Sequence, residues 1–350
     1  MNKEPLVSIF IPVYNREAYI EECLESVVNQ SYQNLEIVIL DDGSTDNTLS
    51  IIAKFKDPRI KQFKNDKNRG ITYSRSRTLE LITGDYLALV DSDDIIEHDR
   101  IEKQMHVMLA RPDIAVVGSN TLSFGDGMRT IKTKFFTDFE EIKCAFLFET
   151  PMNNSSTLLN ASMVRAHQTQ YNPEYIVCED YDFFYQISKY APLVNIKEPL
   201  VKYRLHEENV SRQQIFVKGK SRRRITLEKI QRSVSQYYSL GLSDEEQQIF
   251  SDFFIQSGDY DPAIFEAPFI NELQRVTQKM KDNNHFCSPK TFSKVFDYYL
   301  IIILNLRKVS LKDKLMIYKK LNDKDSKIQK AKMISYFVLR DLYHNVRGIK

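Results

Sequence analysis

The chain has 350 residues, of which 42% are apolar and 27% are charged, and this composition is typical of a folded globular protein rather than a disordered one. Its longest apolar run, Tyr298–Leu306, is too short to span a bilayer, and the first residues lead straight into a strand-like run without a leader pattern. The four cysteines form no CxxC pair, which indicates reduced thiols, so we expect a cytoplasmic protein.

Charge is distributed unequally along the chain. Residues 211–350 contain 26 Lys and Arg against 15 Asp and Glu, although the net charge of the whole chain is only +2. An acidic part followed by a basic part suggests two units with different partners. We expect catalysis in the acidic part. The basic part either faces an anionic acceptor or a membrane surface, or it simply exposes Lys-rich helices.

Strand-like and helix-like segments alternate through the first 120 residues. Strands that alternate with helices predict βαβ units and a mostly parallel sheet with helices on both faces. Such a sheet is buried on both faces, which explains why the strands are continuously apolar. The expected strands are 6–11, 35–40, 60–65, 85–90 and 114–120, and the expected helices are 17–29, 48–56 and 71–82.

The pattern changes after residue 121. Residues 123–134 are polar and contain glycine, which predicts a loop or hairpin. From about Ser211 onward most segments have helical spacing. We therefore expect a catalytic domain over residues 1–215 and a mainly α-helical accessory domain over residues 216–350.

Polar clusters follow three of the expected strands: Pro12–Asn15, Asp41–Ser44 and Asp91–Asp94. Ligands of open sheets bind beyond the carboxyl ends of the strands, so the three clusters should share one edge. The third cluster has three aspartates in four residues, whose charges repel unless a cation lies among them. Mg²⁺ is commonly held by one or two carboxylates and a substrate's phosphates. The cluster predicts a metal–diphosphate site or, alternatively, a solvated acidic turn in which Asp94 caps the next helix.

In order and spacing, these segments resemble the family 2 glycosyltransferases, nucleotide-diphospho-sugar transferases of the GT-A fold. The resemblance covers about residues 5–210 and implies a Rossmann-like α/β GT-A domain, followed here by the C-terminal α-helical region. The segments that carry it are Ile11–Asn15, Gln30–Asp46, Asn68–Gly70, Arg75 ahead of Gly84–Tyr86, Asp91–Asp94 and Glu179–Asp180.

The resemblance implies a nucleotide-sugar site along the predicted edge. Pro12, Tyr14 and Asp42 would surround the base, with Asp42 accepting a hydrogen bond from a ring NH. Arg75 would meet a phosphate or pair with Asp91. The alternatives are a packing role for Tyr14, an ordinary turn aspartate at Asp42 and a structural ion pair at Arg75. The complete donor-binding set would be Pro12, Val13, Tyr14, Asn15, Asp42, Asn68, Gly70, Arg75, Asp91, Ser92 and Arg204.

A divalent metal, Mn²⁺ or Mg²⁺, is also implied by the resemblance. Asp93 would bind it directly, and Asp91 would hold the ribose or the metal's water. His206 would complete the metal or phosphate site, although a lone histidine is equally consistent with a structural role. Arg204 would meet the diphosphate.

The same resemblance assigns the base of the reaction. Asp180 would take the proton of an acceptor hydroxyl as that oxygen attacks the anomeric carbon, and a single displacement inverts the centre. Glu179 would orient a donor sugar hydroxyl or the acceptor. Alternatively, Glu179 and Asp180 begin a helix, where acidic residues are favoured by the helix dipole.

The implied function is hexosyl or N-acetylhexosaminyl transfer from a nucleotide-diphosphate sugar, most simply a UDP-sugar. The acceptor would be a saccharide or lipid-linked glycan in surface polysaccharide or glycoconjugate biosynthesis. Two alternatives stay open: a nucleotidyltransferase, although no G-x-G-x-x-G or P-loop follows the first strand, and a catalytically inactive nucleotide-sugar-binding partner. Nucleic acid is not expected, because the catalytic part is acidic.

The C-terminal part offers a candidate membrane contact. Residues 218–224 form a basic run, and residues 317–350 combine Lys and Arg with an amphipathic apolar pattern. Such a helix can lie on an anionic membrane surface, here the inner face of the cytoplasmic membrane. We prefer the alternative, an accessory helical domain that packs its apolar faces together.

Overall fold

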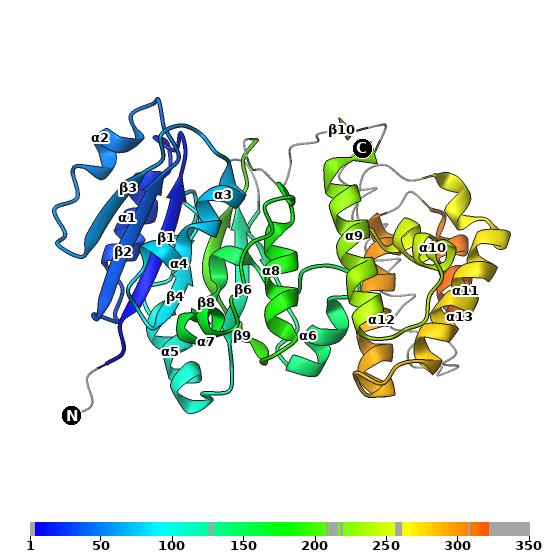
Figure 1. The fold of residues 1–350 in the computed structure, drawn as a ribbon. Coiled ribbons are helices and arrows are strands. Elements are labelled where there is room, and N and C mark those ends of the chain that lie inside the picture. The colour runs from blue at the N-terminus through cyan, green and yellow to red at the C-terminus, as the bar shows by residue number, and fades with distance from the viewer. Residues whose placement is uncertain are drawn as a thin grey trace. The chain divides into compact units, whose positions relative to one another are not determined.

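The structure is a computed structural model (Figure 1). The chain divides into two compact units, Met1–Ile215 and Phe216–Lys350, and each is described by itself. The described residues are 4–125, 129–207, 209, 216–217, 220–255, 261–306 and 309–321.

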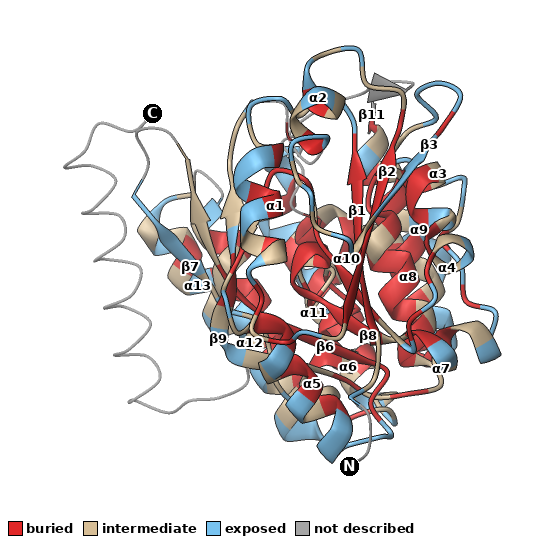
Figure 2. Cartoon of the chain, turned by 90° about the vertical axis from the view of Figure 1, so that its left-hand side faces the viewer, coloured by how far each residue is buried: buried red, intermediate tan, exposed pale blue. Residues whose placement is uncertain are grey.

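The first unit is built on a sheet whose N-terminal half is parallel. Strand β1 (Val7–Val13) lies between β2 (Leu35–Asp41) and β4 (Tyr86–Leu89), and both run parallel to it. Strand β3 (Ile60–Lys64) continues the parallel block beside β2. Every residue of β1 and β2 is buried, as expected for strands that are covered on both faces (Figure 2).

The other half of the sheet is mixed. β8 (Leu158–Asn160) runs antiparallel to β4 and to β6 (Val116–Phe124), whereas β6 pairs in parallel with β9 (Leu193–Arg204). β5 (Ile95–Ile96) and β7 (Ile131–Thr133) add antiparallel pairs, and β6–β7 is the predicted hairpin. The α/β class is confirmed, and the parallel pattern holds where crossover helices return the chain to the same end.

Eight helices accompany this sheet in the described part of the first unit. The predicted helix over 71–82 is interrupted at Arg77, where the Thr78 hydroxyl donates to the Arg75 carbonyl at 2.7 Å. A single 3₁₀ turn, Asn154–Ser156 (η1), precedes β8. The helices are α1 (Ile20–Val28), α2 (Thr48–Ile52), α3 (Ile71–Ser76), α4 (Thr78–Leu81), α5 (Arg100–Ala110), α6 (Phe139–Ala145), α7 (Ala161–Ala166) and α8 (Glu179–Ser188).

The second unit is mainly helical in its described residues, as predicted. Its helices enclose an aromatic core that includes Phe250, Phe254 and Phe296. Ser243 and Glu246 form a reciprocal capping box that fixes the start of one helix. The elements are β10 (Phe216–Val217), β11 (Lys220–Ser221), α9 (Arg222–Tyr237), α10 (Asp244–Phe254), the 3₁₀ turn η3 (Pro262–Phe265), α11 (Ala267–Asp282), α12 (Pro289–Leu306) and α13 (Leu311–Leu321).

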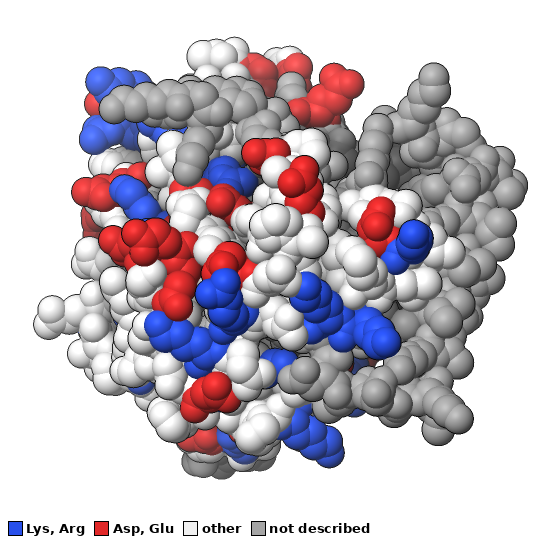
Figure 3. Space-filling view, turned by 90° about the vertical axis from the view of Figure 1, so that its right-hand side faces the viewer, with Lys and Arg blue, Asp and Glu red and all other residues white. Residues whose placement is uncertain are grey.

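The proposed membrane-contact segments lie largely outside the described residues. Residues 218–219 and 322–350 are not described, so the amphipathic pattern over 317–350 stays a prediction. The face shown in Figure 3 carries both basic and acidic side chains. Among the described helices, none combines the length and apolar character that crossing a bilayer requires.

Candidate active site

The carboxyl ends of β1, β2 and β4 lie at one edge of the sheet, as predicted. In the parallel register, Val13 faces Asp41, and Phe10 faces Leu89. Asp42, just beyond β2, donates its backbone N–H to the Val13 carbonyl at 2.8 Å. The loops that follow the three strands therefore leave the sheet side by side.

Asp42 is a buried carboxylate that organises the neighbouring loop. Its Oδ1 accepts hydrogen bonds from Asn65 Nδ2 at 2.7 Å and from the backbone N–H of Arg69 at 3.0 Å. Its Oδ2 accepts from the backbone N–H of Gly70 at 2.8 Å. Gly70 is half-buried and has φ +87°, a left-handed conformation that favours glycine. Its N–H also lies 3.0 Å from Oδ1 of the exposed Asn68, so the two residues are held in one loop.

The segment after β1 is fastened to the loop after β2. Asn15 adopts φ +48°, which is uncommon for a residue with a side chain. Its N–H donates to Ser44 Oγ at 3.0 Å, and its Oδ1 accepts from the Thr45 N–H at 2.9 Å. Tyr14, just beyond the buried Pro12 and Val13, is 37% exposed and offers an aromatic ring at the edge.

Arg75 joins two acidic segments that are distant in the sequence. Its guanidinium NH2 donates to Asp91 Oδ1 at 2.7 Å, and its NH1 donates to Glu179 Oε1. The arginine is buried, and although burial lowers an arginine pKa, the two carboxylates raise the pKa of Arg75 overall. The guanidinium of Arg75 thus bridges the turn after β4 and the first residue of α8.

Glu179 and Asp180 have different environments at the start of α8. Glu179 is buried, and burial raises its pKa to about 7, against the opposing effect of Arg75 and with a further increase from Asp180. Asp180 is half-buried, and its Oδ1 accepts from the Tyr181 N–H at 2.9 Å. The helix start given as the alternative role of this pair is present, and Asp180 is the more accessible of the two carboxylates.

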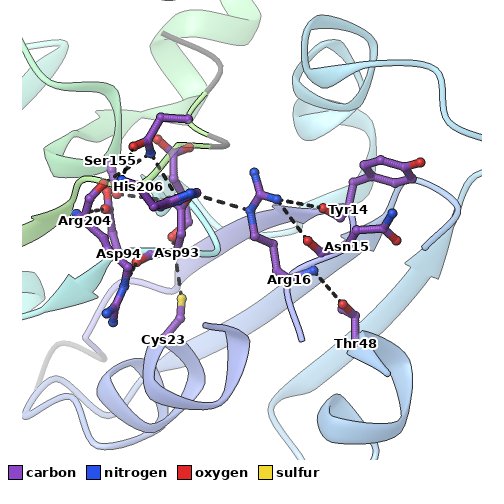
Figure 4. A network of polar contacts seen from close by, with 12 residues as sticks. Tyr14, Asn15, Arg16, Cys23, Thr48, Asp93, Asp94, Ser155, Arg204 and His206 are labelled. Atoms are coloured by element: carbon purple, nitrogen blue, oxygen red, sulfur yellow. Dashed lines mark hydrogen bonds and ion pairs between the residues drawn. The ribbon is translucent and has the colours of Figure 1, made fainter. Parts of the chain in front are cut away.

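Asp93 lies between a histidine and an arginine. Its Oδ2 is 2.9 Å from His206 Nε2 and 3.5 Å from Arg16 Nε (Figure 4). The His206 ring packs on Tyr19 with a centroid separation of 4.6 Å. Neighbouring Asn209 approaches His206 Nε2 at 3.2 Å and also accepts from the His206 N–H. The histidine that sequence reasoning placed near the aspartate cluster therefore contacts Asp93 directly.

Asp94 does not cap the following helix, and that expectation is wrong. Helix α5 begins at Arg100, while Asp94 is fully buried and accepts the backbone N–H of Arg204 at 2.9 Å. Burial and the charges of Asp93 and Asp91 raise the pKa of Asp94 well above its ordinary value. Asp94 therefore ties the turn after β4 to the end of β9.

Arg204 completes this junction from the end of β9. Its Nε donates to the Asp93 carbonyl at 2.9 Å, and its NH2 pairs with Glu22. The guanidinium lies over the rings of Tyr19 and Phe124, 5.1 and 4.6 Å from their centroids. These contacts hold Arg204 beside the aspartate turn.

Asp93 and His206 are the side chains that could hold a divalent cation. A carboxylate suits both Mg²⁺ and Mn²⁺, and an imidazole favours the transition metal of the two. His206 Nδ1 is buried and has no hydrogen-bond partner within the described residues. Asp91, which was predicted to hold the ribose or the metal's water, accepts a hydrogen bond from Arg75 at Oδ1. In the part of the chain that is described, no three His, Cys, Asp or Glu side chains form a metal cage by themselves.

Sequence reasoning assigned no role to two residues that shape this site. Ser155 Oγ accepts the Asp91 N–H at 3.0 Å, and Arg16 contacts Asp93. Ser155 lies in a run of five polar residues, Asn153–Thr157, and that polar run was the available signal. Arg16 follows the segment Pro12–Asn15 directly, and that adjacency was the available signal.

Comparison with known proteins adds to this geometry. Residues 8–163 match the family model described as Glycosyl transferase family 2. An uncharacterised glycosyltransferase of Haemophilus influenzae is 35% identical over 222 residues, which cover 60% of this chain and 69% of that protein. A hyaluronan synthase of Pasteurella multocida is 27% identical over 80% of this chain, which spans only 29% of the synthase.

Solved structures agree on the fold. A crystal structure of TarS from S. aureus superposes with a TM-score of 0.56 at 17% identity, covering 90% of each chain. This likeness supports the GT-A fold expected from the sequence. The family-model match and the extent of the match to the Haemophilus protein lead to one conclusion: the chain belongs to glycosyltransferase family 2 and is a glycosyltransferase.

Proposed function

We propose that this protein is a metal-dependent, inverting glycosyltransferase that uses a UDP-linked sugar. One observation carries the proposal: Arg75 binds both Asp91, in the predicted diphosphate turn, and Glu179, the neighbour of the predicted base Asp180. A transferase must hold the leaving diphosphate and the attacking hydroxyl on opposite sides of one carbon. The shared arginine brings the two required segments together.

Asp180 acts as the general base in this proposal. It lies in the first turn of α8 and is more accessible than Glu179, so an acceptor hydroxyl can reach its carboxylate. Proton removal as the acceptor oxygen attacks the anomeric carbon forms the new glycosidic bond while the bond to the diphosphate breaks. General-base assistance of this kind contributes roughly 10²–10⁴ in rate. Glu179 positions Arg75 and, through it, the turn that contains Asp91.

The nucleotide binds along the tips of β1 and β2. The exposed Tyr14 ring supplies a flat surface for the base, and Asp42 supplies an acceptor for a ring NH. Asp42 already accepts three hydrogen bonds, and a carboxylate has about four acceptor positions, so one remains. TarS, which shares the fold, has been crystallised with UDP-GlcNAc and with UDP, which supports a UDP-linked donor here.

Asp93 and His206 would hold the divalent cation, and the imidazole favours Mn²⁺ over Mg²⁺. When bound, the cation neutralises charge on the departing diphosphate. These two side chains would be the protein's ligands, and cation sites of this kind commonly add oxygens from a substrate's phosphates. Asp94 and Arg204 position this pair by fixing the turn against β9.

The acceptor is a saccharide or lipid-linked glycan hydroxyl, and the transferred sugar is a hexose or N-acetylhexosamine. Relatives named as hyaluronan synthase and chondroitin synthases support assembly of a surface polysaccharide. The chain spans only 29% to 34% of those synthases, so the likeness supports the transfer step and not their whole activity. In this proposal the protein works in the cytoplasm, where it meets glycans at the inner membrane face.

The test is a donor screen with purified protein and Mn²⁺. UDP-, GDP- and dTDP-sugars are compared by thermal shift and by release of nucleoside diphosphate, since a ligand that binds the folded state raises its melting temperature. We expect a UDP-sugar to bind only with Mn²⁺ present, and Asp93→Asn to lose that binding. Equal donor binding by Asp93→Asn, or turnover that is unaffected by EDTA, would contradict the metal assignment.

A further inference from the structure

Arg16 connects the two halves of the proposed donor site. Its NH1 donates to the backbone carbonyls of Tyr14 at 3.3 Å and Asn15 at 3.0 Å, in the proposed nucleotide segment. Its Nε lies 3.5 Å from Oδ2 of Asp93, the proposed metal ligand. Figure 4 shows the side chain lying between these two groups. The guanidinium therefore occupies the region between the base-binding segment and the metal carboxylate.

The backbone of Arg16 is anchored on both sides. Its N–H donates to Thr48 Oγ1 at 2.7 Å, and its carbonyl accepts from Tyr19 at 3.0 Å and Ile20 at 2.9 Å. The preceding Asn15 is held in its left-handed conformation by Ser44 and Thr45. With the backbone fixed in this way, the side chain is the part of Arg16 that can change partners.

The contact between Arg16 and Asp93 is a loose one. A charge-assisted N–H···O bond is typically about 2.7–2.9 Å long, whereas this Nε–Oδ2 separation is 3.5 Å. The shorter contact to the same oxygen, 2.9 Å, comes from His206. The negative charges of Asp91 and Asp94 favour a positive group such as Arg16 beside Asp93. The same positive charge repels a divalent cation that binds Asp93 Oδ2.

We propose that Arg16 neutralises Asp93 in the donor-free enzyme. When a divalent cation binds that carboxylate, the Arg16 side chain moves away from Asp93 and its guanidinium pairs with the donor diphosphate. The proposal rests on the metal-dependent transfer proposed above. A guanidinium matches the geometry of phosphate oxygens with two parallel N–H donors. Arg16 thus exchanges one anionic partner for another, and the negative charge of the diphosphate reduces its repulsion from the divalent cation.

This exchange couples metal binding to donor binding. Without a donor, Arg16 competes with the cation for Asp93 and weakens metal affinity. With a donor, Arg16 binds the diphosphate and no longer opposes the cation. Because coupling free energies are reciprocal, metal and nucleotide should each strengthen the binding of the other. The protein would then hold its metal firmly only as the metal–nucleotide pair.

The decisive variant is Arg16→Gln, and the probe is Mn²⁺ followed by the electron paramagnetic resonance signal of the free ion. We expect Mn²⁺ affinity without nucleotide to rise about fivefold or more over wild type, the lower end of typical coupling. We expect UDP affinity at saturating Mn²⁺ to fall about 10- to 100-fold, since a hydrogen bond to a charged group is lost. The two affinities should therefore move in opposite directions.

Two further variants complete the design. Arg16→Lys keeps the positive charge but not the planar donor pair, so its Mn²⁺ affinity should stay near wild type while its UDP affinity is intermediate. Arg111→Gln is the matched control, because Arg111 pairs with Asp113 just after α5, away from the aspartate turn, and both affinities should be unchanged.

The outcomes separate this proposal from the proposed function. If Arg16→Gln binds Mn²⁺ alone no better than wild type, or if both fail to bind it, the exchange proposal is overturned. A fall in both affinities would mean a purely structural role and overturns it as well. If Asp93→Asn abolishes Mn²⁺-dependent UDP binding while Arg16→Gln matches wild type, only the Arg16 proposal fails. If Asp93→Asn binds like wild type, the proposed metal site itself fails.

Discussion

Acidic side chains are buried at both ends of the parallel strands, but their hydrogen bonds and the directions of their pKa shifts differ between the two ends. At the amino ends, Glu36 accepts hydrogen bonds from Ser8, from Gly84 at 3.2 Å and from the Thr83 hydroxyl at 2.7 Å. Lys61 pairs at 2.6 Å with Oε2, the oxygen that also accepts from the Thr83 hydroxyl. Burial by itself raises the pKa of Glu36, but the hydrogen bonds from Lys61, Ser8 and Thr83 outweigh it and lower the pKa to about 2.

At the carboxyl ends, the effect of burial, which raises a carboxyl pKa, outweighs the effect of hydrogen bonds and ion pairs, which lowers it. Burial raises the pKa of Glu179 to about 7 and raises the pKa of Asp94 well above its usual range, despite nearby donors. Asp94 Oδ2 has no hydrogen-bond partner within the described residues. The amino-end cluster is satisfied by its own chain and stabilises the fold. The carboxyl-end cluster keeps acidic groups that lack full compensation, which is the usual condition of a site that binds cations or moves protons.

The largest effect that sharpens this comparison is expected at Asp180. Asp180→Asn removes the proposed base and should lower kcat about 10²- to 10⁴-fold while Mn²⁺-dependent donor binding survives. The measurement is steady-state release of nucleoside diphosphate with the donor identified in the screen. Asp182→Asn is the control on the same helix, because Asp182 is a buried acid that accepts from Gln186 at 3.1 Å, and its kcat should stay near wild type. Near-normal turnover of Asp180→Asn would mean that another group is the base.

The next effect concerns stability at the amino ends. Glu36→Gln removes the charge that Ser8, Thr83 and Lys61 hold, and should lower the free energy of unfolding by about 2 kcal/mol, as expected for hydrogen bonds to a charged group. Urea unfolding at pH 7 measures the loss. Donor binding per folded molecule should not change, because Glu36 is at the opposite end of the strands from the proposed site.

The same variant has a defined pH dependence. The pKa of Glu36 falls from 4.5 to about 2 on folding, so its stabilisation is complete above pH 4.5 and is lost as pH falls toward 2. The difference in stability between wild type and Glu36→Gln should therefore narrow over that range. A constant difference from pH 5 to pH 2 would show that the charge of Glu36 is not what stabilises the strand ends.

Glu179 should show the opposite slope. Its pKa rises from 4.5 to about 7 on folding, so the folded state binds more protons than the unfolded state between these pH values. The contribution of Glu179 to the free energy of unfolding of the wild type should therefore decrease as pH rises from about 4.5 to 7. Glu179→Gln should lack that decrease. Unfolding of both proteins at pH 5 and pH 8 checks the sign, and parallel curves would contradict it.

The contrast also explains what the sequence could predict. The strand tips, the Asp91–Asp94 turn and the Glu179–Asp180 pair follow from apolar periodicity and motif spacing, because each lies within a short stretch of chain. The contacts that join them do not. Arg75 to Glu179 spans 104 residues, and Asp94 to Arg204 spans 110. The antiparallel pairing of β8 with β4 and β6 likewise depends on tertiary packing that no local pattern encodes.

The smallest expected effect is at Lys61. Its ammonium pairs with Glu36 but is 47% exposed, and such partly solvated pairs contribute roughly 0–1 kcal/mol. Lys61→Gln should therefore lower the free energy of unfolding by less than about 1 kcal/mol, well below the effect of Glu36→Gln, because Ser8, Thr83 and Gly84 still donate to the carboxylate. Urea unfolding of both variants in one buffer makes the comparison. A loss at Lys61 as large as that at Glu36 would mean that the ion pair, rather than the enclosed hydrogen bonds, stabilises the amino ends of the sheet.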